Sequence, residues 1–195
     1  MTIVFCVVFS SLFSNGNWKS YAPSLLAGMA IWGFLKDSAL SGCRALTNNE
    51  SYIRQSPLPY ALYSLRTVAG QAIHFLIALA VVLVLLLCLG IQQPDVSRVL
   101  VLKMLPFIIP GLVMAFIFAW AVATITSFVN VYFQDTQHLM DVGAQIMFFL
   151  TPIMYPAEVL ANNGLTWLLI INPANLYMEL IRTPIVNGEI GRAHV

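Results

Sequence analysis

Long apolar blocks separated by short polar stretches form the pattern of this chain of 195 residues. An α-helix needs roughly 20 apolar residues to cross a hydrocarbon core about 30 Å thick. Four blocks approach or exceed that length, at 21–40, 68–89, 99–129 and 140–155. A fifth block, 1–13, is too short, and we interpret it as a first span that lacks its beginning. The pattern predicts an all-α, polytopic transmembrane bundle with about five spans.

The two ends of the chain need separate interpretations. A signal peptide is the alternative for 1–13, but the positively charged start of such a peptide is absent. We therefore expect Met1 to be an internal methionine used as a start. Residues 190–195 match one translated frame of a sequencing adapter, so we expect a non-native read-through tail. Residues 1–189 are predicted to form one membrane domain, with a sixth span following Gly188.

The pattern changes after Pro156. Residues 166–171 are apolar but too short to span, and prolines and asparagines surround them. A segment of this kind at membrane depth is usually re-entrant or interfacial and must be buried in protein. We expect a re-entrant segment here.

Composition supports the membrane interpretation. Hydrophobic residues make up 59% and charged residues 9% of the chain, against about 45–50% and about 25% in soluble domains. The net charge of +1 gives no indication of a nucleic-acid partner. If the start is cytoplasmic, the inner loops hold four Lys or Arg residues and the outer loops three. The positive-inside rule favours this orientation only slightly.

Sequence motifs of nucleotide-binding proteins and hydrolases are absent. There is no G-x-x-x-x-G-K-[ST], H-E-x-x-H, G-x-S-x-G or paired-cysteine metal spacing. We therefore expect no catalytic residue, no metal site and no cofactor in this chain. The ionisable candidates His74, Lys103 and the pair His138/Asp141 lie near predicted helix ends, where a lone histidine more often packs or forms a hydrogen bond.

The polar stretch 41–66 contains a helix-start signal. Thr47-Asn48-Asn49-Glu50 fits a capping box, in which threonine and glutamate reciprocally satisfy free amides. Pro57 and Pro59 end the helix that follows, so a short helix is predicted at 48–55. It either lies on the membrane surface or forms a rigid contact for a cytoplasmic partner.

A second polar segment, 134–141, precedes the last long block. Asp135 is a candidate N-cap for a helix that continues through 140–155. Helical spacing places Gln134, His138, Asp141 and Gln145 on one face, and Phe148, Phe149 and Pro152 continue it. Aromatic rings beside hydrogen-bonding groups suit the apolar faces and hydroxyls of sugars. The alternative is that both phenylalanines pack against helices or lipid.

Several short motifs occur in an order that resembles a known family. Asn130, Val131, Phe133 and Asp135 lead to the stretch FFLTPIMYP at 148–156, and Asn172-Pro173 is followed by Arg182. Residues 21–32 and Leu58-Pro59-Tyr60 complete the order. The sequence resembles the ABC-2-type transporter permeases, the membrane subunits of bacterial exporters of O-antigen, capsule and teichoic acid. Tyr60 departs from the family's Phe-Pro-Arg, which puts the basic contact at that position in doubt unless Arg54 or Arg66 substitutes.

The resemblance implies half of an exporter in the bacterial inner membrane. Such permeases form homodimers and dock a separate ATPase subunit, which holds ATP and Mg, and they move a glycan or lipid-linked cargo. The resemblance maps an ATPase-coupling helix onto Thr47, Asn48, Glu50, Tyr52 and Arg54. It places an outer gate at 155–182 and implies translocation-path or gate roles for His138, Asp141, Gln145, Phe148, Phe149, Pro152, Tyr155, Asn172 and Arg182.

Three other functions remain open. One is a membrane-embedded glycan-processing enzyme, and another is a scaffold for assembly proteins. The third is an ABC-2-type permease that moves drugs or lipids. The sequence does not identify the cargo.

Overall fold

A computed structural model describes residues 18–55, 58–90, 98–153, 172 and 174–178, and these residues include no strand. The order of elements is α2 (Trp18–Cys43), the 3₁₀ turn η1 (Thr47–Asn49), α3 (Glu50–Gln55), α4 (Ala61–Gly90), α5 (Arg98–Tyr132) and α6 (Thr136–Leu150). Residues 174–178 are also helical.

The apolar blocks at 21–40, 68–89 and 99–129 each lie inside one long helix, so the all-helical class is confirmed. Within the described residues, two helical stretches are long and apolar enough to cross a membrane, Ala61–Leu85 and Ile108–Tyr132. Residues 1–13, 155–171 and 179–195 lie outside the described part. The five-span count and the re-entrant segment therefore stay predictions.

The block at 140–155 was predicted to be helical to its end, and that is wrong. Helix α6 ends at Leu150, and Thr151 is extended with φ −90° and ψ 132°. Thr151 precedes Pro152, and a proline ring disfavours helical geometry in the residue before it. The proline therefore ends the helix after fifteen residues.

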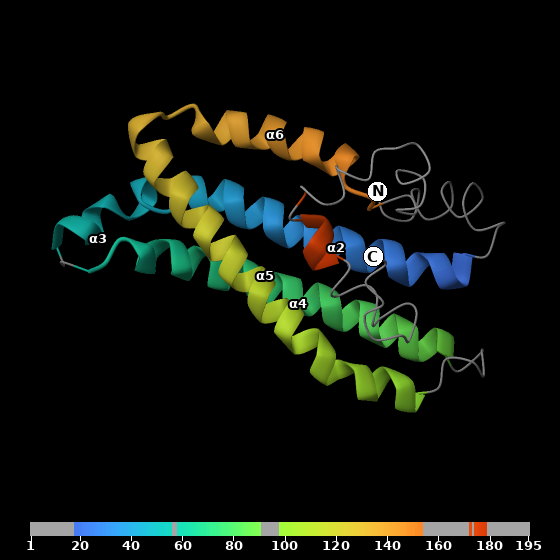
Figure 1. Cartoon of the computed structure of the whole chain (residues 1–195). Helices are drawn as coiled ribbons and strands as arrows, with labels where there is room; N and C mark the ends of the chain where they lie inside the picture. Colours follow the sequence, from blue (N-terminus) through green and yellow to red (C-terminus); the bar gives the residue numbers. More distant parts are fainter. Residues whose placement is uncertain (1–17, 56–57, 91–97, 154–171, 173, 179–195) are drawn as a thin grey trace.

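Helix α2 lies at the centre of the described bundle, and α4, α5 and α6 pack against it (Figure 1). Successive long helices run in opposite directions. The short helix α3 projects from one end of the bundle, where α5 ends and α6 begins (Figure 1). This arrangement brings residues near 44 and 137 together, although they lie far apart in the sequence.

Small residues allow α2 and α5 to approach closely. Ala115, Ala119 and Ala123 recur at intervals of four along α5 and are almost fully buried. A Cβ atom on Gly42 of α2 would lie only 2.6 Å from the Cα of Ala123. Because lipid tails are as apolar as leucine, membrane helices associate through close packing and interhelical hydrogen bonds. The α2–α5 contact has both, since the Thr126 hydroxyl donates to the Ala39 carbonyl at 3.3 Å.

The outer surfaces of α4 and α5 are mostly apolar, with Arg66 and His74 of α4 also exposed. Exposed side chains on these two helices include Ile73, Leu76, Ile77, Val81, Val84, Ile109, Val113, Met114, Ile117 and Ile125. Large contiguous apolar surfaces mark membrane or protein contacts rather than contact with water. The apolar surface of α4 and α5 fits contact with lipid, while α2 occupies the interior.

Candidate functional site

Helix α3 forms without the predicted capping box. The Thr47 hydroxyl donates to the Arg44 carbonyl at 3.2 Å, and the Glu50 carboxylate accepts from Arg54, with Nη2 and Oε1 2.5 Å apart. The prediction took Thr47 as the N-cap, but Thr47 is already the first residue of η1. Even Leu46 before it has right-handed helical geometry and makes no side-chain cap. A capping box requires an N-cap residue outside the helical region. The chain instead turns directly from α2 into η1 and α3.

The residues predicted to contact an ATPase are all exposed. Thr47, Asn48, Glu50 and Arg54 lie on the surface, and Tyr52 is 60% exposed. No residue of η1 or α3 is buried. Farther along, Tyr60 stands edge-on to Phe128 of α5, with 6.1 Å between ring centroids. The sequence-predicted contact residues therefore gather on one projecting turn and helix.

Three side-chain contacts of described residues join α2, or the turn that directly follows it, to α6. Lys36 Nζ lies 3.5 Å from Asp141 Oδ1, and Arg44 Nε donates to Gln137 Oε1 at 2.5 Å. Farther along the two helices, the rings of Trp32 and Phe148 are 6.1 Å apart and tilted. The residue numbers rise along α2 as they fall along α6, so these contacts follow one antiparallel seam. We call this row of contacts the α2–α6 seam.

The predicted polar-aromatic face of α6 is divided in the structure. Asp141 and Phe148 lie on the side toward α2. Gln145 is exposed, and its Nε2 donates to Asp141 Oδ2 at 3.4 Å. His138 is exposed, and Phe149 is 74% exposed while its ring stands edge-on to Phe148 at 5.4 Å. Gln134 precedes the first residue of α6. The structure thus directs Asp141 and Phe148 toward α2, pairs Gln145 with Asp141, and leaves His138 and Phe149 exposed.

Asp135 occupies the N-cap position of α6 as predicted, but its side chain makes no capping hydrogen bond. The Thr136 hydroxyl instead donates to the Phe133 carbonyl at 2.5 Å. Thr136 is also the buried residue of this helix. The start of α6 is therefore held by a tight turn rather than by a side-chain cap.

Asn172 links the end of α6 to a later helical segment. Its Nδ2 donates to Thr151 Oγ1 at 2.7 Å, and its Oδ1 accepts from the Ala174 amide at 3.0 Å. Asn172 is buried, as are Pro152 and Met178. Tyr155 and Arg182, the other predicted gate residues, lie outside the described residues. Asn172 thus has a definite structural role, because it starts a helical turn and ties it to Thr151.

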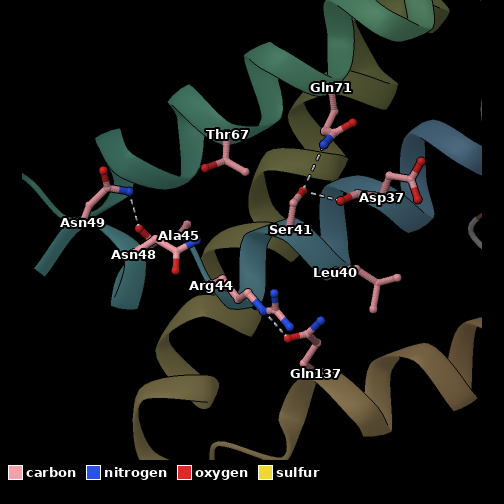
Figure 2. A pocket seen from close by; sticks show the side chains of 10 residues that line it. All are labelled: Asp37, Leu40, Ser41, Arg44, Ala45, Asn48, Asn49, Thr67, Gln71 and Gln137. Atoms are coloured by element: carbon pink, nitrogen blue, oxygen red, sulfur yellow. Dashed lines mark hydrogen bonds between the residues drawn. The ribbon is translucent and has the colours of Figure 1, made fainter.

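A polar cavity of about 440 Å³ lies beside the turn that leads to α3 (Figure 2). Helices α2, α4 and α6 and the turn η1 contribute its walls. Its lining residues are Asp37, Leu40, Ser41, Arg44, Ala45, Asn48, Asn49, Thr67, Gln71 and Gln137. The Arg44–Gln137 hydrogen bond forms part of one wall (Figure 2).

The sequence predictions missed Lys36, Arg44 and Gln137. Lys36 and Arg44 are eight residues apart, which places them on one stripe of a helix, and this spacing was available from the sequence. Their partners were not, because the pairing depends on how α6 packs. Among the described residues, no group of three or more His, Cys, Asp or Glu side chains is placed to hold a metal ion.

The long apolar helices, the small-residue packing and the apolar outer surface define a helical membrane protein. The family model for the ABC-2 type transporter matches residues 1–186. The chain belongs to the ABC-2 type transporter family.

Curated relatives share the same region. An O-antigen export system permease protein RfbA of Klebsiella pneumoniae is 26% identical over 176 residues, which cover 90% of this chain and 65% of that protein. The protein of the same name from Myxococcus xanthus is 23% identical over 172 residues, which cover 88% of this chain and 63% of that protein. The chain thus spans less than two thirds of the length of these relatives.

Proposed function

We propose that the chain is the permease part of an ABC exporter that moves a polysaccharide or lipid-linked glycan across the bacterial inner membrane. A separate ATPase subunit holds ATP and Mg and drives transport. The match of the family model to residues 1–186 carries this proposal. The relatives named as O-antigen export permeases support a glycan cargo.

The projecting helix α3 suits the role of the ATPase-coupling helix. A helix of six residues is marginal by itself. Here the preceding 3₁₀ turn and the Glu50–Arg54 ion pair support it without burying any of its residues. Most of its surface therefore remains open to a partner, and Tyr52 offers that partner a large exposed ring.

Helix α6 suits a translocation path. Gln145 provides a hydrogen-bonding group about one turn from the rings of Phe148 and Phe149, and Asp141 provides another about two turns away. Sugars present hydroxyls and apolar C–H faces, so this combination fits a glycan better than a wholly apolar cargo. We assign path or gate roles to these four residues and to His138, Pro152, Tyr155, Asn172 and Arg182.

The proposed assembly contains two permease copies, two ATPase copies and the surrounding bilayer. Within the described residues, the outer faces of α4 and α5 are mostly apolar, whereas α6 exposes His138 and Gln145 beside its apolar side chains. This difference supports lipid contact along α4 and α5 and a second copy opposite α6.

Reconstitution with the cognate ATPase tests the proposal. The permease should co-purify with the ATPase, and proteoliposomes that hold both should move the lipid-linked glycan of the source strain only when ATP is present. An ATPase subunit with its catalytic glutamate replaced is the matched control. Export without that ATPase, or chemical change of the glycan by the permease alone, would favour a glycan-processing enzyme instead.

A further inference from the structure

The two polar contacts of the α2–α6 seam are spaced along both helices. Lys36 lies within α2, and Arg44 is the first residue after the end of α2 at Cys43. Eight residues at about 1.5 Å each separate the two by about 12 Å. Their partners Asp141 and Gln137 are separated by one turn of α6. A single contact would let α6 rotate about it. Two contacts at different positions along the helices oppose both translation and rotation of α6 relative to α2. The pair of contacts therefore determines the position of α6 along α2.

Apolar packing leaves this position weakly determined. Thr136 is the buried residue of α6, while Leu139, Val142 and Ile146 are more than half exposed. Helix α6 packs mainly on α2 and less on α5. Lys36 and Asp141 are themselves 33% and 46% exposed, and exposed ion pairs contribute little to stability. Their main consequence is therefore the position of α6 rather than the stability of the fold.

The same end of α2 continues into α3 without a flexible linker. The amide of Ala45 donates to the Gly42 carbonyl at 2.9 Å, and the amide of Asn48 donates to the Arg44 carbonyl at 2.9 Å. The Asn49 side chain adds a bond to the Ala45 carbonyl at 2.7 Å. A displacement of α3 must therefore move the turn at the end of α2 that contains Arg44.

We propose that Lys36–Asp141 and Arg44–Gln137 form a two-point clasp that transmits the displacement of α3 through α2 to α6. The four residues are positioning residues for export, and the inference rests on the proposed coupling role of α3. At the far end of the seam, Trp32 and Phe148 carry the displacement to the aromatic part of α6.

Charge reversal tests the clasp in the reconstituted permease–ATPase complex. Lys36→Glu should leave assembly and ATP hydrolysis near the wild-type level, and Asp141→Lys, which also alters a proposed path residue, is the second single variant. The glycan exported per ATP hydrolysed should fall about 5-fold or more, the lower end of typical coupling effects. The double variant Lys36→Glu/Asp141→Lys restores the pair with opposite polarity and should recover most of that yield, and Lys36→Arg should retain it. Normal yield in the single variants, or no recovery in the double variant, would overturn the clasp.

Asp37→Lys is the matched control. Asp37 neighbours Lys36 on α2, is exposed, and makes no side-chain hydrogen bond or ion pair to α6 within the described structure. This variant introduces the same charge change as Asp141→Lys, and its yield per ATP should stay close to that of the wild type. A loss equal to that of Asp141→Lys would show that local charge, not the clasp, is responsible.

A second measurement follows α6 directly. In a variant without native cysteines, Leu139→Cys places a fluorophore on the exposed face of α6. Its emission should change on ATP addition, lose that change in Lys36→Glu and regain it in the charge-swapped pair. An ATP-dependent change that persists in Lys36→Glu would also overturn the clasp. A wild-type permease that neither binds the ATPase nor exports glycan would overturn the proposed function itself.

Discussion

Gly42 lies at the closest approach of α2 and α5, and its size is required there. An added Cβ would lie 2.6 Å from the Cα and 2.7 Å from the Cβ of Ala123, so the two backbones would have to separate. Gly42→Ala should therefore destabilise the fold by about 1–3 kcal/mol, as overpacking of a core does. Thermal unfolding of the detergent-purified protein measures this.

Gly70→Ala is the control for that experiment. Gly70 also lies within a long helix, but an added Cβ would meet nothing within 4 Å. Alanine favours the helix over glycine by about 1 kcal/mol, so this variant should unfold at the same or a higher temperature. Equal destabilisation of both variants would mean that Gly42 is not a packing residue.

Asn172 makes two different hydrogen bonds, which substitutions can separate. Asn172→Ala removes the acceptor for the Ala174 amide and the donor to Thr151, so it should destabilise the fold by about 1–3 kcal/mol. Asn172→Asp keeps the acceptor and should be less harmful. Thermal unfolding of the two variants compares them, and an unchanged midpoint for Asn172→Ala would show that the link to Thr151 contributes nothing.

Substitutions in α3 should affect function without changing the stability of the fold. Because no residue of α3 is buried, Glu50→Ala/Tyr52→Ala should leave the unfolding temperature unchanged. If α3 is the coupling helix, the same variant should lose ATPase co-purification and export. Ile73→Ala, which truncates a side chain equally exposed at 60% on α4, is the control and should retain both. Unchanged association in the α3 variant would assign the coupling role elsewhere.

The two aromatic residues of α6 should differ in their effects. Phe148→Ala removes a ring that packs near Trp32 and should lower both stability and export. Phe149→Ala removes a ring that is 74% exposed, so it should reduce export with little change in unfolding temperature. Transport assays and unfolding measured on the same preparations distinguish the two effects. Export at the wild-type level in the double variant would exclude an aromatic wall of the path.

The whole molecule is expected to function as a dimer of permeases. Asp141 and Gln145 lie on a helix that is largely uncovered within the described residues, and a polar path through a membrane needs protein on all sides. Native mass spectrometry of the detergent-solubilised complex should show two permease and two ATPase copies. A single permease in the active complex would require another protein to complete the path.

The sequence alone determined the helical membrane class and most helix positions. Continuous apolar runs long enough to cross a bilayer are expected to form α-helices, because a backbone in lipid must satisfy its own hydrogen bonds. The pattern thus predicted α2, α4 and α5, and Pro57 and Pro59 marked the end of α3 correctly. Local rules were less reliable where two elements join, since the capping box at Thr47 failed and Pro152 ended α6 early.

Tertiary structure decided which residues lie together. The eight-residue spacing of Lys36 and Arg44 was present in the sequence, but nothing local specified Asp141 and Gln137 as their partners. The close contact at Gly42 likewise depends on how α5 crosses α2. Hydropathy determines that a helix enters the membrane. Side-chain shape and hydrogen bonding between helices determine which neighbour it meets. Burial of apolar surface does not decide this, because such surface is equally favourable against lipid and against another helix.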